Sequence, residues 1–163
     1  MSLHSPEEFK KFYEEHAPKV RGMLFRLVGE QSLSDLTQEA FLKAWEHRDK
    51  FRGDAEASTW LYRISYNCAV DYLRKNRNKQ MPADVEVSAT SQEEELSGRE
   101  IVDLLLRSLD IEQRAVVILF YFEDQGIKEI SESLSIPEGT VKSRLNHARQ
   151  KMNEFLTKKG VAQ

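Results

Sequence analysis

The stretch Ile136–Met152 reads IPEGTVKSRLNHARQKM, and it decides the fold class because its residues form two contrasting helical faces. Val141, Leu145, Ala148 and Met152 recur at intervals of three and four, which is the spacing of one buried helix face. The opposite face carries amines, amides and hydroxyls. The pattern therefore predicts a helix over about 137–156 that packs on one side and presents hydrogen-bonding groups on the other.

The segment before this stretch has the features of a shorter partner helix. IKEISESL, over 127–134, is amphipathic, and the Ser135 and Glu138 that follow it have the spacing of a capping box. Two helices joined by so short a turn predict a helix-turn-helix. In that motif the second helix lies in the DNA major groove, where its outward side chains contact base edges.

Seven side chains of the second helix are candidates for DNA contact. Lys, Asn and Ser side chains can hydrogen-bond to base edges, whereas Arg and Thr side chains suit phosphates. Positions 137–159 carry six basic residues and two acidic ones, which favours an anionic partner. From these residues alone, a solvated amphipathic helix in an ordinary bundle remains an alternative. The candidates are Lys142, Ser143, Asn146 and His147 for bases, and Thr140, Arg144 and Arg149 for phosphates.

The composition is that of a globular protein of the cytoplasm. Of the 163 residues, 40% are hydrophobic and 31% charged, and no apolar run approaches the length of a membrane span. The first residues have no apolar core of a signal peptide, and the single cysteine, Cys68, fits a reducing compartment. There is no metal-ligand spacing of Cys and His and no glycine-rich phosphate loop, so we expect no metal and no cofactor.

Charge and helical periodicity divide the chain into two parts. Residues 81–100 hold six acidic side chains and one basic one, and they alone make the net charge negative, at −3. We therefore predict an all-α protein of two small helical domains, 1–80 and 99–163, joined by a flexible acidic linker over 81–98. The expected helices are about 6–28, 32–48, 58–77, 99–108, 111–124, 127–134 and 137–156.

The segment DLTQEAFLKAWEH, Asp35–His47, predicts an amphipathic helix in the first domain. Apolar residues lie on one side, and Asp35, Gln38, Glu39 and Lys43 lie on the other. Taken alone, this pattern is typical of an ordinary helix that contributes one face to a core.

The segment from Phe51 to Lys79, FRGDAEASTWLYRISYNCAVDYLRKNRNK, mixes cations with aromatic residues. A single face carries Arg63, Asn67, Asp71 and Arg74, and four aromatic residues are interleaved with these charges. Cations can follow a phosphate backbone while aromatic faces stack on unpaired bases, and an amide can read the edge of an extruded base. The alternative is that the aromatic residues are core, and for Trp60 and Tyr72 core packing is at least as plausible.

Several of these motifs resemble one protein family. IPEGTVKSRLNHAR, with LDIEQRAVVILFYFED upstream, resembles the domain of extracytoplasmic-function (ECF) sigma factors, of the sigma-70 family, that reads the promoter −35 element. Ser135 replaces the usual glycine of the turn, and Asn146 and His147 replace the usual basic pair. The resemblance covers roughly 7–79 and 97–156, and Phe51–Lys79 resembles the reader of the melted −10 element.

The resemblance assigns roles to three sets of residues. Thr140, Lys142, Ser143, Arg144, Asn146, His147 and Arg149 would bind −35 DNA. The −10 set comprises Asn67 and Asp71 for the base pocket and the loop residues Arg52, Gly53, Asp54, Ala55, Glu56, Ala57, Ser58 and Thr59. The charge pattern adds the cations Arg63 and Arg74 of the same helix face to this set. Asp35, Gln38 and Glu39 would contact RNA polymerase.

The resulting hypothesis is a non-catalytic promoter-specificity subunit of RNA polymerase. Its expected partners are core RNA polymerase, promoter DNA and an anti-sigma factor. One alternative is a stand-alone dimeric helix-turn-helix regulator, which would have no need of the aromatic and basic segment. Another is an enzyme or small-ligand binder centred on Asp71 with Arg63 or on Glu93–Glu95, but no nucleophile–base pair supports it.

Overall fold

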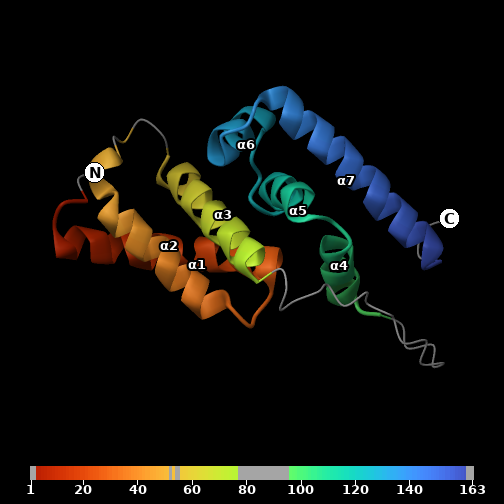
Figure 1. Cartoon of the computed structure of the whole chain (residues 1–163), viewed down its shortest axis with the longest axis horizontal. Helices are drawn as coiled ribbons and strands as arrows, with labels where there is room; N and C mark the ends of the chain where they lie inside the picture. The colour runs from red at the N-terminus through yellow and green to blue at the C-terminus, as the bar shows by residue number, and fades with distance from the viewer. Residues whose placement is uncertain (1–2, 52, 54–55, 77–95, 161–163) are drawn as a thin grey trace.

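A computed structural model describes residues 3–51, 53, 56–76 and 96–160, and this part of the chain is helical, as predicted (Figure 1). The first domain contains α1 (Pro6–Val28), α2 (Leu33–Glu46), the 3-10 turn η1 (Arg48–Lys50) and α3 (Ala57–Lys75). The second contains α4 (Gly98–Arg107), α5 (Ile111–Val117), the π-helical turn η2 (Ile118–Phe122), α6 (Ile127–Leu134) and α7 (Glu138–Lys158). Most of the predicted linker, up to residue 95, lies outside the described residues.

The first domain is a three-helix bundle in which each helix packs against the other two. Its first helix begins where a capping box satisfies the free backbone donors: Glu8 N donates to Ser5 Oγ at 3.1 Å, and Ser5 N donates to Glu8 Oε2 at 3.3 Å. Phe12 is buried and lies beside Phe51 and Trp60, so Trp60 contributes to the core.

The second domain places α7 across α5 and α6. Its α5 begins at Asp110, whose carboxylate accepts a hydrogen bond from Gln113 N at 2.9 Å. Val141, Leu145 and Ala148 of α7 are buried, which confirms the predicted apolar stripe. The helix pair α6–α7 is therefore the predicted helix-turn-helix.

The turn between α6 and α7 differs from the prediction. Ser135 does not cap α7; it ends α6 in the left-handed conformation, with φ 55° and ψ 48°. The N-cap of α7 is Pro137, and no side-chain hydrogen bond caps that helix, so the predicted capping box is wrong. The physical reason is that Ser135 occupies the position after α6 where a left-handed residue reverses the chain direction.

Two of the expected helices change to another helix type before their expected ends. The helix expected over 32–48 ends at Glu46 and continues as a 3-10 turn, and the helix expected over 111–124 changes to a π-helical turn after Val117. In that turn Glu123 N donates to the carbonyl of Ile118 at 3.1 Å, an i→i−5 bond.

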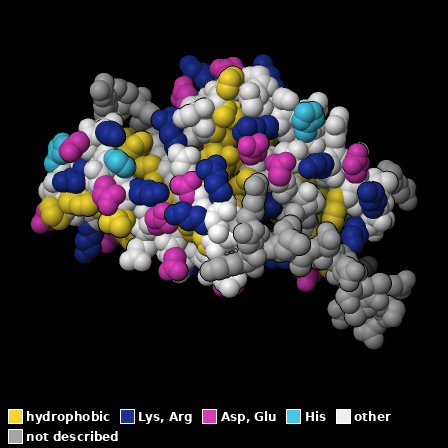
Figure 2. Space-filling model, in the orientation of Figure 1, with side chains coloured by type: hydrophobic (Ala, Val, Ile, Leu, Met, Phe, Trp, Pro, Cys, Tyr) yellow, Lys and Arg dark blue, Asp and Glu magenta, His cyan; other side chains and the backbone are white. Residues whose placement is uncertain are grey.

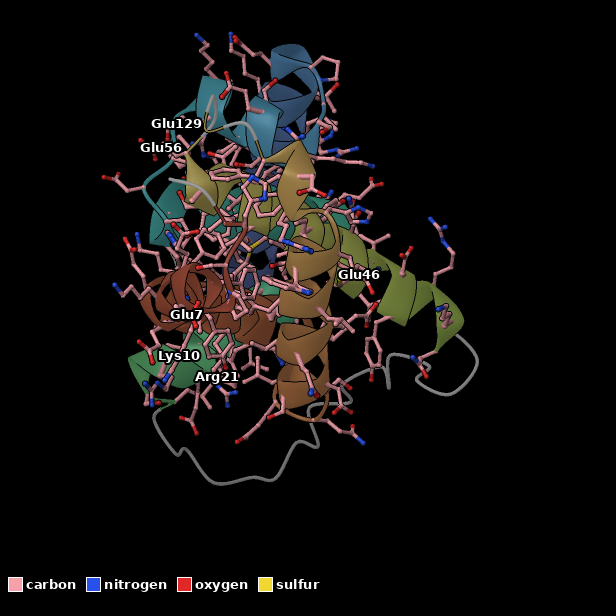
Figure 3. All side chains as sticks on the ribbon, turned by 90° about the vertical axis from the view of Figure 1, so that its left-hand side faces the viewer. Glu7, Lys10, Arg21, Glu46, Glu56 and Glu129 are labelled. Carbon is pink, nitrogen blue, oxygen red and sulfur yellow. The ribbon has the colours of Figure 1, made fainter. Side chains whose placement is uncertain are left out.

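The two domains contact each other, chiefly through α3 and α6 (Figure 1). Figure 3 shows Glu56, just before α3, and Glu129, on α6, at the same edge of the molecule. The Tyr62 hydroxyl of α3 donates to Glu123 Oε2 of the second domain at 2.5 Å. The neighbouring residue Phe122 contacts α1: the Arg26 guanidinium lies 4.3 Å from the centroid of its ring.

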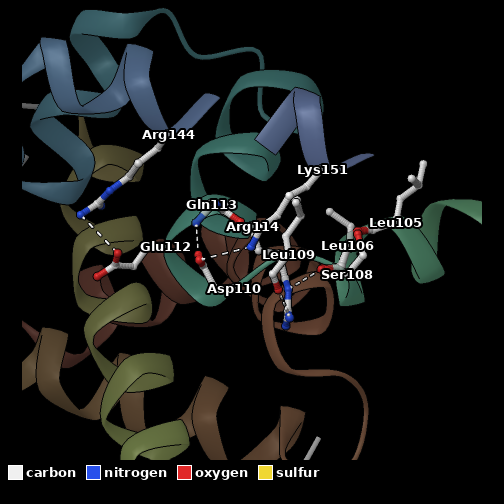
Figure 4. Close-up of polar contacts among 10 residues, drawn as sticks. All are labelled: Leu105, Leu106, Ser108, Leu109, Asp110, Glu112, Gln113, Arg114, Arg144 and Lys151. Atoms are coloured by element: carbon white, nitrogen blue, oxygen red, sulfur yellow. Dashed lines mark hydrogen bonds and ion pairs between the residues drawn. The ribbon is translucent and has the colours of Figure 1, made fainter. Parts of the chain in front are cut away.

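A half-buried arginine also joins the two domains. Arg114 Nε and Nη2 donate to the carbonyls of Leu106 and Leu109 at 2.7 and 2.8 Å (Figure 4). Arg114 Nη1 donates to the carbonyl of Leu27 at the end of α1. Burial lowers the pKa of Arg114, but its three carbonyl partners compensate for the lost hydration.

Candidate nucleic-acid and polymerase interfaces

The exposed face of α7 carries the four predicted base-contact residues. Lys142, Ser143, Asn146 and His147 are all exposed, because they lie opposite the buried stripe that packs on α5 and α6. The helix thus presents an ammonium, a hydroxyl, an amide and an imidazole along one side. Such a surface can donate hydrogen bonds to the edges of base pairs.

The three predicted phosphate contacts flank this face in different environments. Thr140 is half-buried near the start of α7. Arg144 is also half-buried, and its Nη2 lies 3.6 Å from Glu112 Oε2 of α5 (Figure 4). Arg149 is exposed, and its Nε donates to the Tyr121 hydroxyl at 2.9 Å. The sequence pattern did not indicate a role for Tyr121, since it falls in an apolar run, ILFYF, typical of a core.

The predicted −10 residues of α3 lie along one helical face, but the structure separates Arg63 from the others. Asn67, Asp71 and Arg74 are exposed. Arg63 is half-buried, and its Nη2 donates to the carbonyl of Glu132 on α6. Three of the four predicted residues therefore form one exposed surface. The fourth, Arg63, contacts the helix-turn-helix instead.

The loop before α3 is only partly described. Gly53 is exposed with φ 72°, a conformation that favours glycine, and Glu56 is exposed as well. Ala57 and Ser58, at the start of α3, are half-buried, and Thr59 is buried. The predicted loop residues Arg52, Asp54 and Ala55 lie outside the described residues.

The exposed side of α2 carries the three predicted polymerase contacts, Asp35, Gln38 and Glu39. Glu39 Oε1 lies 3.2 Å from Lys43 Nζ, and this hydrogen bond raises the pKa of Lys43. Beside Gln38 is a surface hollow of about 570 Å³ between α1 and α2. Its rim includes Tyr13 and Leu42, which are 43% and 56% exposed.

The apolar rim was not predicted from the sequence. Leu42 could have indicated this rim in advance. It falls outside the apolar stripe of its helix, so its side chain had to be exposed. An apolar surface next to exposed carboxylates and an amide is typical of a protein–protein interface.

The contacts between the two domains bring parts of the two predicted DNA surfaces together. Arg63 of α3 binds the backbone of α6. Tyr66 of α3 faces Arg144 of α7: burial raises the pKa of Tyr66, and the Arg144 guanidinium opposes that rise. On the face drawn in Figure 2, Lys and Arg side chains are interspersed with Asp and Glu side chains.

Comparisons with known proteins agree with this geometry. Residues 12–79 match the family described as Sigma-70 region 2, and residues 99–152 match Sigma-70, region 4. The ECF RNA polymerase sigma-E factor of Escherichia coli K12 is 32% identical, with 81% of this chain and 78% of that protein covered. The chain belongs to the ECF sigma factors of the sigma-70 family.

A further relative supports the same conclusion, and a solved structure shares the fold. The ECF sigma factor SigW of Bacillus subtilis is 28% identical, and the match covers 92% of this chain and 89% of that protein. The fold is similar to that of the sigma factor RpoE from Bartonella quintana, solved in complex with the anti-sigma factor NepR. That similarity has a TM-score of 0.74 at 24% identity and covers 93% of this chain and 98% of the other.

The sigma factor binds core RNA polymerase and promoter DNA and directs promoter-specific initiation of transcription. It is a non-catalytic subunit, and the match to both regions decides against a stand-alone dimeric regulator. Among the residues that the structure describes, no helix is long and apolar enough to cross a membrane, and no group of three His, Cys, Asp or Glu side chains is placed to hold a metal ion.

Proposed function

We propose that this sigma factor divides promoter recognition among three surfaces. The exposed face of α7 reads the −35 duplex, α3 with the loop before it captures bases of the melted −10 element, and α2 contacts the polymerase. The proposed domains are residues 1–80 for −10 and polymerase binding, 81–98 for the linker, and 99–163 for −35 binding. We place this activity in the cytoplasm.

The observation that carries the proposal is the two-faced character of α7. Val141, Leu145 and Ala148 are held in the core, so the rotation of the helix is determined. The side chains on the other side, Asn146 among them, are exposed and rich in donors. A helix fixed in this way can enter the major groove without losing any core contact.

The −10 surface fits a different form of DNA. Asn67 and Asp71 are one helical turn apart and exposed, and they lie near the cation Arg74. The amide of Asn67 can bond the edge of a single unpaired base, and Asp71 can accept from an amino group. Capture of bases that have left the stack would supply part of the free energy needed to melt the element.

An anti-sigma factor is a further proposed partner. The support is the fold similarity to RpoE, which was solved in complex with NepR. Such a partner would inhibit initiation by covering the polymerase surface or one of the DNA surfaces.

Two asparagine variants test whether α3 reads the −10 element and α7 reads the −35 element, and each variant is the control for the other. Asn67→Ala should reduce discrimination at one −10 base on pre-melted promoters and leave −35 preference unchanged. Asn146→Ala should change preference at about one −35 base pair, by about 1–3 kcal/mol against the preferred base, and leave −10 preference unchanged.

The measurement is transcription by the reconstituted holoenzyme. Bubble templates would carry each of the four bases at every −10 position, and duplex templates would carry every base pair at each −35 position. If Asn67→Ala showed the same −10 base preferences as wild type, Asn67 would not belong to the −10 site. If the two variants exchanged their effects, the assignment of the two domains would be wrong.

A further inference from the structure

The second domain has an exposed aromatic side chain that the promoter-reading residues do not include. Tyr121 is 54% exposed and lies in η2, the π-helical turn that continues α5. A turn closed by i→i−5 bonds holds one more residue than an α-helical turn, so it redirects the side chains within it. Ile118 and Leu119 remain buried in the core, whereas Tyr121 faces outward beside α7.

Three contacts hold the Arg149 guanidinium against this turn. Arg149 Nε donates to the Tyr121 hydroxyl at 2.9 Å, and Arg149 Cζ lies 5.5 Å from the centroid of the Phe120 ring and 5.8 Å from that of Tyr121. The two rings meet edge to face with centroids 4.9 Å apart. A long, exposed side chain that would otherwise sample many rotamers is thereby restricted to one region.

The hydrogen bond also leaves the binding capacity of Arg149 intact. A guanidinium has five N–H donors, and the bond to Tyr121 uses only the Nε proton. The four protons on Nη1 and Nη2 can form the fork that suits a phosphate. Arg149 follows Asn146 by three residues, so the two side chains are neighbours on the surface of α7. If Asn146 faces the bases, Arg149 lies toward the rim of the groove, where the phosphates are.

We infer that Tyr121 is a positioning residue for −35 binding: it holds the Arg149 guanidinium ready for a DNA phosphate. The inference rests on the proposed role of α7 and adds a residue from η2 to it. Binding orders a rotamer-rich side chain at a cost, and a side chain that is already ordered avoids that cost. Tyr121 acts through Arg149, so its effect disappears when Arg149 is absent.

The test compares reconstituted holoenzymes that carry Tyr121→Phe, Arg149→Ala or both. The phenylalanine keeps the ring and removes only the hydroxyl that accepts from Arg149. Dissociation constants for a promoter duplex are measured at several salt concentrations, on the preferred −35 sequence and on single-base-pair variants of it. Thr157→Val, which removes an exposed hydroxyl from the last turn of α7, is the control, and circular dichroism checks the fold.

Tyr121→Phe should weaken binding about three- to tenfold, to the same extent on every −35 variant, and should have no further effect in the Arg149→Ala background. An unchanged affinity for Tyr121→Phe would overturn the inference. So would a loss confined to one base pair, or an undiminished loss in the Arg149→Ala background.

The Arg149→Ala variant separates this inference from the proposal beneath it. Loss of one phosphate contact should make the negative slope of log K against log salt less steep, by about 0.9. If both the slope and the affinity stay at wild-type values, Arg149 does not touch a phosphate, and the proposed docking of α7 fails together with the inference. If Arg149→Ala weakens binding and Tyr121→Phe does not, only the inference fails.

Discussion

Glu39 shows how a residue can serve an interface without contributing to the fold. Its side chain is exposed on α2, and its ion pair with Lys43, at 3.2 Å and one turn away, is a surface pair of small energetic value. Gln38 next to it borders the hollow whose rim includes Leu42. A charge reversal at Glu39 therefore changes what a partner protein meets and leaves the core of the first domain unchanged.

We predict that Glu39→Arg weakens binding to core RNA polymerase at least tenfold, because a like charge placed in an interface costs several kcal/mol. The measurement is the dissociation constant for core enzyme, with circular dichroism to confirm the fold. Glu154→Arg, an equal charge reversal on α7, is the control and should bind normally. Wild-type affinity for Glu39→Arg would show that α2 does not contact the polymerase with this face.

The turn of the helix-turn-helix depends on a backbone conformation that serine tolerates poorly. Ser135 has φ 55°, where an L-residue with a Cβ atom is strained and glycine is not. The backbone N–H of Ile136 donates to the carbonyl of Ser131 at 3.1 Å, and the Ser131 hydroxyl donates to the carbonyl of Ile136 at 2.5 Å. These bonds hold the turn in place although the glycine usual in the family is absent.

Ser135→Gly should raise the free energy of unfolding by up to about 1 kcal/mol, because relief of the left-handed strain exceeds the added entropy of the unfolded chain. Ser135→Val, with a branched Cβ, should lower it. Urea unfolding of the full chain followed by circular dichroism measures both. A loss of stability with glycine would mean that the serine side chain makes a contribution greater than its strain.

The start of α4 predicts a pH dependence. Glu100 accepts a hydrogen bond from Ser97 N at 2.8 Å, and Ser97 Oγ accepts one from Glu100 N at 3.3 Å. The Ser97 backbone N–H first, and then the Ser97 side chain, stabilise the Glu100 carboxylate and lower the pKa of Glu100 below its usual value. A carboxyl whose folded-state pKa is lowered stabilises the fold above its unfolded pKa, and this contribution disappears as the pH falls through the folded pKa.

We therefore expect wild type to lose more stability than Glu100→Gln when the pH is lowered from about 6 to about 3. The measurement is urea unfolding of both proteins across that range. Glu14→Gln, at an exposed carboxyl on α1, controls for the removal of one acidic group. If the stability of wild type and of Glu100→Gln fell by the same amount over this pH range, the capping box would not contribute to the pH dependence.

At the scale of the whole molecule, contacts between the two domains cover parts of the proposed DNA surfaces. Arg63 is bonded to α6, and Tyr62 is bonded to Glu123 across the domain interface. Burial first, and then the Glu123 carboxylate, raise the pKa of Tyr62 far above its usual range, so this phenol remains a donor at neutral pH. We therefore expect the domains to part when the proposed −10 and −35 surfaces bind their separate elements, which would break these contacts.

A variant without the Tyr62–Glu123 bond should open more readily. Tyr62→Phe with Glu123→Gln removes a charge-assisted hydrogen bond, and such bonds contribute about 1.5–3 kcal/mol. We expect about tenfold tighter binding of a −35 duplex by the free sigma factor, together with a longer distance between fluorophores on the two domains. Glu129→Gln, on the exposed side of α6, is the control. Unchanged affinity and distance in the double variant would show that the closed state does not limit DNA binding.

Much of this molecule was predictable from local pattern. The helical class, the extent of α6 and the buried stripe of Val141, Leu145 and Ala148 follow from the spacing of apolar residues, because an amphipathic helix must bury one face wherever it packs. The same rule indicated which side chains of α2 and α7 are exposed, and hence which could meet a partner. The sequence motifs also identified the family, because the two motifs occur in the order of regions 2 and 4.

Other features depended on contacts between residues far apart in the chain. Nothing local marks Arg63 as a ligand of the Glu132 carbonyl, or Tyr121 as an outward-facing partner of Arg149, because each contact joins segments that only the packed domains bring together. The left-handed Ser135 likewise follows from the path that the chain must take between two packed helices. Sequence periodicity determines which face of a helix is buried. Tertiary structure alone decides what that face and its flanks meet, because the energy of a long-range contact depends on the positions of both partners.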